Sequence, residues 1–257
     1  MVKEISSASN RLIKEVKSLR NKSKRIETRK YIAEGENVVE EAILYKECDI
    51  ECVFVTEKFL SKVENCEFDV YLIPEYIMEG ISDTMSPQGI LAVMRMEENE
   101  FSINSCDLVV YLDNVSDPGN LGTIIRTADA AGVGMIVLSP ECTDVFSPKV
   151  IRATMGSCFH IDIVKESEYL LYLKKLLEDN FKIVAGSLKA TNFHFDINLK
   201  SKIVLCLGNE AHGLSDELLS LKGILPVKIP IIGKAESLNV AVAGAILMYE
   251  ALRQRGE

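Results

Sequence analysis

Short apolar runs alternate with helical patterns along most of this chain, and this alternation limits the fold more than any other feature. In the second half of the sequence, the runs typical of buried strands are 108–113, 135–139, 159–164, 181–186, 203–208 and 227–231. Helical patterns lie at 121–131, 148–154, 167–178 and 237–253. Because strand–helix–strand repeats build a parallel sheet with helices on both faces, we expect a doubly wound α/β domain here.

The first hundred residues predict a second, smaller α/β unit. Helical patterns lie at 10–19, 36–45 and 75–81, and strand-like runs at 50–56, 69–73 and 86–94. The stretch 97–105 is polar, acidic and aperiodic, which is typical of a linker. We therefore expect domains at 1–98 and 108–257, joined by a linker at 99–107.

Composition excludes several classes of protein. The charged start has no apolar core of a secretory signal, and the longest apolar run, 240–249, is too short to cross a bilayer, which takes roughly 20 residues. Seven scattered cysteines without a CxxC pattern indicate reduced thiols in a cytoplasmic protein. The three histidines form no cluster with cysteine, so we expect no metal and no membrane association.

Charge is distributed unevenly along the chain. The net charge is −9, which by itself disfavours a nucleic-acid partner. Residues 1–30, however, contain ten basic and three acidic side chains, a net charge of +7, which leaves −16 for the rest. This asymmetry indicates a basic segment that engages an anionic partner, although a solvated helix would look the same.

Three stretches with glycine and asparagine follow predicted strands, where parallel sheets bind ligands. They are 113–122, 207–215 and 229–239. In the first, Asn120 is placed to cap the helix that follows, and Arg126 lies less than two turns into that helix; the alternative is that Asn120 only caps and Arg126 only pairs with Asp129. In the third, polar Ser237 and Asn239 open a helix of small residues, which ordinary helix-on-sheet packing would also explain.

The second stretch is not expected to bind a nucleoside triphosphate. Gly208 and Gly213 have the spacing of a Walker loop, but Leu214 stands where that loop has its lysine. The dinucleotide fingerprint and the GxSxG elbow of hydrolases also fail, because 132–134 precedes a strand and 155–159 lacks the elbow pattern. An open loop that brings a ligand close to backbone groups remains.

In this order, the three stretches resemble the SpoU/TrmH family of RNA ribose 2′-O-methyltransferases, of the SPOUT superfamily. The matching segments are DNVSDPGNLGTIIRTADAAGV (113–133), LGNEAHGLS (207–215) and IPIIGKAESLNVAVAGAI (229–246). The amino-terminal unit is similar to the family's ribosomal-protein-like RNA-binding domain, through Arg29, 34–36 and 86–89. The resemblance implies a carboxy-terminal domain with a trefoil knot, S-adenosyl-L-methionine as methyl donor, an RNA substrate and a homodimer with the active site across its interface.

The resemblance also implies a set of site residues. The catalytic set would be Asn120, Arg126, Glu210, Ser237 and Asn239. The cofactor would contact Ser187, Leu207, Gly208, Ile229, Ile231 and Leu238. The residues expected to bind RNA are Arg11, Arg20, Lys22, Lys24, Arg25, Arg29 and Lys30.

The chemistry of these residues limits their roles. A ribose 2′-hydroxyl is a poor nucleophile, so it needs in-line placement and help in losing its proton. Arg126 and Glu210 are the ionisable candidates, but a guanidinium with a pKa above about 12 is a poor base. We expect Arg126 to orient the ribose and its phosphate, and Glu210 to orient its neighbours. The group that takes the proton stays open.

We therefore expect a cytoplasmic enzyme that methylates a ribose 2′-hydroxyl, with ribosomal RNA as its substrate. Two alternatives remain: the same reaction on transfer RNA, and a non-catalytic RNA-binding or ribosome-assembly protein with this fold. The nucleotide and its RNA are not encoded in any motif.

Overall fold

The computed structural model describes residues 2–46, 49–96 and 106–256. The chain forms two compact units, one made of Met1–Glu100 with Asp144–His160 and the other of Phe101–Thr143 with Ile161–Glu257. Of the predicted linker, only 106 and 107 are described. The predicted domain boundaries and the knot therefore stay predictions.

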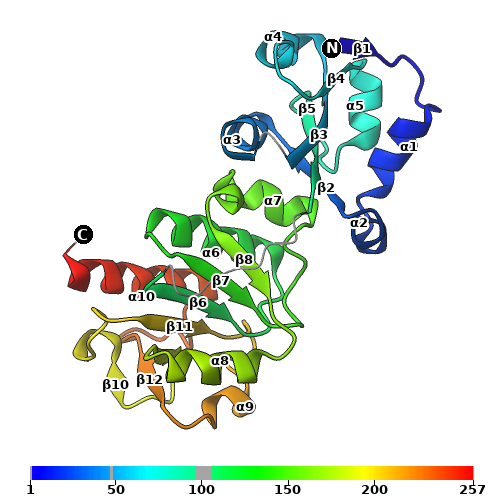
Figure 1. The fold of residues 1–257 in the computed structure, drawn as a ribbon. Coiled ribbons are helices and arrows are strands. Elements are labelled where there is room, and N and C mark those ends of the chain that lie inside the picture. Colours follow the sequence, from blue (N-terminus) through cyan, green and yellow to red (C-terminus); the bar gives the residue numbers. More distant parts are fainter. Residues whose placement is uncertain (1, 47–48, 97–105, 257) are drawn as a thin grey trace. The chain divides into compact units, whose positions relative to one another are not determined.

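The first unit is built on a mixed five-stranded sheet (Figure 1). Its strands are β1 (Val2–Glu4), β2 (Lys30–Glu34), β3 (Ile50–Val55), β4 (Asp69–Leu72) and β5 (Ile90–Arg95). Their order is β1-β4-β3-β5-β2, with β1, β4 and β3 parallel and β5 antiparallel to both neighbours. β1 and β2 were not predicted. Because β1 pairs with β4, and Ile13 and Val16 belong to the core, residues 1–30 are an integral part of the folded unit and not only a basic segment.

Helices cover both faces of this sheet because successive strand residues point to opposite sides. The helices are α1 (Arg11–Ser18), α2 (Lys22–Thr28), α3 (Glu36–Lys46), α4 (Leu60–Val63) and α5 (Glu75–Ile81). The apolar sides of α1 and α5 pack on the face that carries Ile32 and Phe54. The opposite face, with Val53 and Ala33, is covered by α3 and α4.

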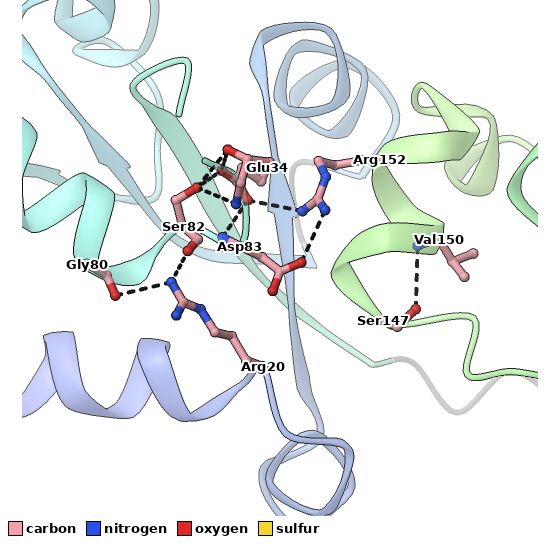
Figure 2. A network of polar contacts seen from close by, with 9 residues as sticks. Arg20, Glu34, Gly80, Ser82, Asp83, Ser147, Val150 and Arg152 are labelled. Carbon is pink, nitrogen blue, oxygen red and sulfur yellow. Dashed lines mark hydrogen bonds and ion pairs between the residues drawn. The ribbon is translucent and has the colours of Figure 1, made fainter. Parts of the chain in front are cut away.

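The segment 144–160 belongs to this first unit, although it lies within the second half of the sequence. It contains α7 (Pro148–Thr154), and its Ile151 and Phe159 are part of the core under α3. Figure 2 shows how Arg152 reaches the buried Glu34 and the nearby Asp83. The strand predicted at 159–164 is accordingly shorter, because 157–159 form a 3₁₀ turn.

The second unit contains a seven-stranded sheet in which every described pair of strands is parallel. Its strands are β6 (Leu108–Leu112), β7 (Met135–Leu138), β8 (Asp162–Lys165), β9 (Lys182–Gly186), β10 (Asn192–Phe193), β11 (Ile203–Leu207) and β12 (Ile224–Lys228). The order is β10-β12-β9-β11-β6-β7-β8, so the central β6 and β11 are buried on both faces. This confirms the expected α/β fold with a parallel sheet.

Four helices accompany this sheet: α6 (Pro118–Ala130), α8 (Tyr169–Glu178), α9 (Asp216–Leu219) and α10 (Val240–Arg255). α6 and α10 pack together, and α10 also lies on β11. Leu173 of α8 and Leu218 of α9 belong to a core with Val109 and Val204. Among the described helices, none is long and apolar enough to span a membrane.

Two helix starts differ from the prediction by three residues, and the capping residues explain both. α6 begins at Pro118, three residues early, because Asp117 accepts a hydrogen bond from the backbone of Asn120 and proline suits the first helical position. α10 begins at Val240 instead of Ser237, because the side chain of Asn239 caps it. The strand predicted at 227–231 is likewise displaced, to 224–228.

Candidate active site

The first and second glycine- and asparagine-bearing stretches begin side by side at one edge of the parallel sheet. β6 and β11 are neighbours in register, with Leu112 opposite Leu207, so the loops that follow them leave the sheet together. Carboxyl ends of adjacent parallel strands are where open α/β sheets bind ligands. The expected location of the site is therefore consistent with the topology.

Glu210 is held by the loop that follows β6. Its Oε1 accepts hydrogen bonds from the backbone N–H of Asp117 (3.1 Å) and from Nδ2 of Asn120 (2.9 Å). Its Oε2 accepts from the hydroxyl (3.0 Å) and the backbone N–H (3.3 Å) of Ser116. No ion pair joins Glu210 to a cation among the described residues.

These donors keep Glu210 ionised. Partial burial raises the pKa of a carboxyl, but the hydrogen bonds from Asn120, Asp117 and Ser116 outweigh it here and lower the pKa of Glu210 from 4.5 to about 2. A carboxylate with so low a pKa is a weak base near neutral pH. Its role in this arrangement is to fix the donors around it and to place a negative charge at the site.

Asn120 extends the contact to the third stretch. Its Oδ1 accepts a hydrogen bond from Nδ2 of Asn239 (2.8 Å), while Oδ1 of Asn239 accepts from the backbone N–H of Ala241 at the start of α10. Glu210, Asn120 and Asn239 therefore form one hydrogen-bonded chain that links all three loops. The expectation that Asn120 caps its helix was wrong, because Asp117 is the cap; Pro118 in the sequence was the signal for this.

Arg126 and Ser237 lie outside this hydrogen-bonded chain among the residues described. Arg126 is exposed on α6, six residues after Asn120 and so on a different side of the helix. Ser237 is exposed in the irregular segment that leads to Asn239. Three of the five predicted catalytic residues are thus brought together, and two face solvent in the single chain.

Gly208 allows the 208–215 loop to close tightly after β11. Asn209 and Gly213 form an isolated β-bridge, with backbone hydrogen bonds of 2.8 and 2.9 Å. A Cβ on residue 208 would lie 2.2 Å from the carbonyl carbon of Gly213, so no other residue fits without moving the backbone. The tight closure presents Glu210 at the tip of the loop.

The residues predicted to hold S-adenosylmethionine fit such a ligand. Ile229, Ile231 and Leu238 are half-buried, which suits contact with an apolar ring. From Ile231 to Leu238 the described backbone groups make no backbone hydrogen bond outside helices and strands, so they are available to the polar edge of an adenine. Ser187 follows β9 and donates its N–H to Val227, next to the start of this segment. Leu207 is buried in β11.

Two residues that sequence reasoning missed organise the site. Nδ2 of Asn209 donates to the backbone oxygen of Asn114, and Oδ1 of Asn209 accepts from the backbone of Ala211 and His212. Asp113 accepts a hydrogen bond from the backbone of Ser215. Their positions directly after buried strands, inside the two motifs, were the available signal.

The residues predicted to bind RNA do not share one environment. Arg25 is 3% exposed, bonds to the backbone of Leu19 and Arg20, and pairs with Asp144. Arg20 donates to the backbone of Gly80 and Ser82 (Figure 2). The guanidiniums of both are thus engaged inside the first unit.

The other five members of that set have more accessible side chains. Lys22 is exposed, whereas Arg11 pairs with Glu15 and Lys24 pairs with Glu27. Lys30 pairs with Glu51, and Arg29 donates to the backbone of Met96. A phosphate could compete for the exposed cations with little loss, since surface ion pairs contribute about 0–1 kcal/mol.

Comparison with known proteins gives a family match for each half of the chain. Residues 107–249 match the model of the SpoU rRNA Methylase family, and residues 10–92 match that of the MRM3-like substrate binding domain. The chain is 36% identical over 248 residues to 23S rRNA (guanosine(2553)-2'-O)-methyltransferase RlmP of Bacillus subtilis, covering 96% of this chain and 98% of the relative.

Solved structures agree with these matches. The AdoMet-bound rRNA methyltransferase from Sinorhizobium meliloti has a TM-score of 0.87 at 35% identity, over 98% of each chain. An RNA 2'-O ribose methyltransferase has a TM-score of 0.84 at 30% identity, over 99% of this chain and 100% of the other. The expected fold, enzyme class and cofactor are confirmed, and the chain belongs to the SpoU rRNA methylase family.

Proposed function

We propose that this protein transfers a methyl group from S-adenosylmethionine to a ribose 2′-hydroxyl of ribosomal RNA. The observation that carries the proposal is the hydrogen-bonded chain of Glu210, Asn120 and Asn239, which joins the three loops at the carboxyl edge of the sheet. The family matches and the names of the similar rRNA methyltransferases support the choice of substrate.

The site residues divide the chemistry between them. S-adenosylmethionine, held by Ser187, Leu207, Gly208, Ile229, Ile231 and Leu238, supplies an electrophilic methyl group. Arg126 binds the ribose and its neighbouring phosphate, and its positive charge makes the 2′-hydroxyl easier to deprotonate. Ser237 offers a hydroxyl beside Asn239 that can bond to the nucleotide. Asn120, fixed between Glu210 and Asn239, orients the loop that carries these contacts.

The active enzyme is a homodimer in this proposal. Val242 and Tyr249 on α10 are both 49% exposed, and seven residues apart they lie on one side of that helix. Gly244 is buried on another side of this helix, where it lies against Leu207 of β11, so α10 packs closely on its own sheet while Val242 and Tyr249 stay exposed. We propose that a second copy covers this surface and that Arg126, on the adjacent α6, completes the site of the partner protomer.

The first unit supplies the RNA contacts, and the enzyme works in the cytoplasm. The exposed cations Arg11, Lys22, Lys24 and Arg29, with Lys30, form the proposed contact set, while Arg20 and Arg25 serve the fold. The cytoplasmic location is supported by the bacterial source of the similar rRNA methyltransferases, because ribosomal RNA lies in the cytoplasm of a bacterial cell. In this proposal the first unit binds RNA and the second unit transfers the methyl group.

Ribose-methylation mapping of total RNA tests the proposal. Cells with and without this protein are compared, and we expect one ribosomal RNA position to lose its 2′-O-methyl group. A lost methyl group on transfer RNA would favour the same reaction on the alternative substrate. Unchanged profiles at every position would contradict the proposal.

Arg126 provides the test of the shared site. Arg126→Ala is expected to abolish methylation while S-adenosylmethionine still binds by calorimetry. Mixing inactive Arg126→Ala with inactive Asn239→Ala protein should restore activity if each site draws Arg126 from the partner, because one site of the mixed dimer is then intact. Absence of any restored activity in verified mixed dimers would contradict the shared site.

A further inference from the structure

Asp113 is a fully buried carboxylate that the proposed reaction does not use. It follows β6 directly, and its backbone N–H donates to the carbonyl of Leu207 at the end of β11 (2.8 Å). It therefore lies at the base of the 208–215 loop. Burying a carboxylate costs folding free energy unless it is paired or fully hydrogen-bonded, so its presence here needs a reason.

The carboxylate bonds to the far end of the same loop. Oδ2 of Asp113 accepts a hydrogen bond from the backbone N–H of Ser215 at 2.7 Å. Through its backbone and its side chain, Asp113 thus contacts both ends of the loop that carries Glu210 at its tip. Because Gly208 lies against Gly213 and Leu214, a small movement of Ser215 is transmitted to the whole loop.

In the part of the chain that the structure describes, several buried polar atoms around Asp113 lack hydrogen-bond partners, which lowers the stability of this part of the fold. Among the described residues, its Oδ1, the Oγ of Ser215 and the hydroxyl of Tyr111 are buried polar atoms without a hydrogen-bond partner. No ion pair of the described residues involves Asp113. An apolar or amide side chain would be less costly to bury here, and so stability alone does not account for a carboxylate.

We propose that Asp113 is a positioning residue for methyl transfer, which fastens Ser215 so that the 208–215 loop holds Glu210 against Asn120. This rests on the proposed role of Glu210. The carboxyl group suits this role because its oxygens accept hydrogen bonds, and Oδ2 already receives the backbone N–H of Ser215 at 2.7 Å. The root of the loop at Leu207 and Gly208 is fastened separately, by the backbone hydrogen bond, which no side-chain substitution removes.

This division predicts a specific kinetic change. In Asp113→Ala, the far end of the loop is released while the cofactor contacts at Leu207 and Gly208 are retained. We expect kcat to fall about 10-fold or more, with the Kd for S-adenosylmethionine changed by less than about 3-fold. Asp113→Asn keeps an acceptor oxygen but loses the charge, and it should recover part of the lost kcat. A residue that only supports the core would change stability without this separation of kcat and Kd.

Amide hydrogen exchange and a double-mutant cycle on the full-length enzyme complete the test. Ser215→Pro removes the donor at a residue whose φ of −62° suits proline. Asp113→Ala and Ser215→Pro should each raise the exchange of amides 209–213, and the double variant should be no worse than the single ones, since all three lack the same hydrogen bond. Fully additive losses would contradict the proposal.

Tyr111→Phe is the control, because it removes a neighbouring buried hydroxyl that has no partner. We expect wild-type kcat and loop exchange from it. Wild-type kcat and an unchanged loop in Asp113→Ala would overturn the positioning role, and so would an equal loss in Tyr111→Phe. Glu210→Gln separates the two proposals: if it is fully active, the role of Glu210 fails, while the exchange data still decide whether Asp113 fastens the loop.

Discussion

Glu34 in the first unit and Glu210 in the second are both carboxylates that accept several hydrogen bonds, and they differ in what opposes their charge. Glu34 in the first unit is 3% exposed and accepts from the hydroxyls of Ser82 and Thr84, from the backbone of Asp83 and from Arg152 (Figure 2). Glu210 in the second unit is exposed and accepts only from neutral donors among the described residues. The number of bonds is similar, but only Glu34 has a cation.

This difference indicates that Glu34 has a structural role and Glu210 a functional one. A buried charge with a paired cation and complete hydrogen bonding contributes order to the fold, and breaking the pair leaves an uncompensated charge. An exposed carboxylate with neutral donors keeps its net charge and costs the fold little when altered. Such a group places a negative charge at the site, where it can attract a positively charged ligand.

The largest expected effect is on stability, at Arg152. Arg152→Met removes the cation opposite Glu34 and Asp83, and we expect the free energy of unfolding to fall by about 2–3 kcal/mol. Chemical denaturation measures it. The double variant Arg152→Met with Glu34→Gln should regain part of the loss, because no buried charge is then left unpaired. A loss below about 0.5 kcal/mol in the single variant would show that Glu34 does not depend on its cation.

A substitution of Glu210 should lower activity and leave stability nearly unchanged, in contrast to Arg152→Met. Glu210→Gln places an amide N–H₂ against the donors of one of the two oxygens, either Ser116 at Oε2 or Asp117 and Asn120 at Oε1, and so disturbs the loop that positions Asn120. We expect kcat to fall about 100-fold, comparable to the loss of one preorganised group in an active site. The free energy of unfolding should change by at most about 1 kcal/mol, since the side chain is exposed. Full activity, or a large loss of stability, would remove the distinction between the two carboxylates.

The pH dependence sharpens the same point. The pKa of Glu210 is lowered from 4.5 to about 2, so its ionised form is the one the folded loop favours. This contribution is complete above about pH 4.5 and is lost as the pH falls towards 2. Carboxyl NMR should therefore show Glu210 titrating near 2, with loop contacts unchanged from pH 8 to 5. A measured pKa of 4.5 or higher for Glu210 would show that the hydrogen bonds from its donors do not stabilise its ionised form.

The smallest expected effect concerns single cations of the first unit. Lys22→Gln should weaken RNA binding by a few-fold and reduce the salt dependence of binding by about one released ion, because Lys22 is exposed. Lys174→Gln on α8 of the second unit is the matched control and should bind as the wild type does. Point variants are used because deleting residues 1–30 would remove Ile13, Val16 and Leu19 from the core. Equal salt dependence in all three proteins would contradict an RNA contact at Lys22.

Much of the fold could be predicted because the buried strands are uniformly apolar. The runs at β6 and β11 were found within one residue of their limits, since both faces of a central parallel strand must be apolar. β1, β10 and α9 were missed because they have only two to four residues. The placement of 144–160 in the first unit depends on contacts far apart in the sequence, such as Arg25 with Asp144, which no local pattern contains.

The site was predictable at the level of motifs but not of contacts. Ordered motifs identified Asn120, Glu210 and Asn239, which the structure joins by hydrogen bonds. Pro118 indicated that Asp117 caps α6, but the hydrogen bonds of the Asn120 side chain to Glu210 and Asn239 follow only from the loop geometry. The supporting roles of Asn209 and Asp113 likewise depend on the closure of the 208–215 loop.

The most direct measurement is methyl transfer from labelled S-adenosylmethionine to ribosomal RNA by the purified protein, followed by nuclease digestion and mass spectrometry of the nucleosides. The account predicts one added methyl group on the ribose of a single nucleotide, and none with Arg126→Ala or only a trace with Glu210→Gln. A methyl group on a base, or no transfer to any RNA by cofactor-binding protein, would contradict it.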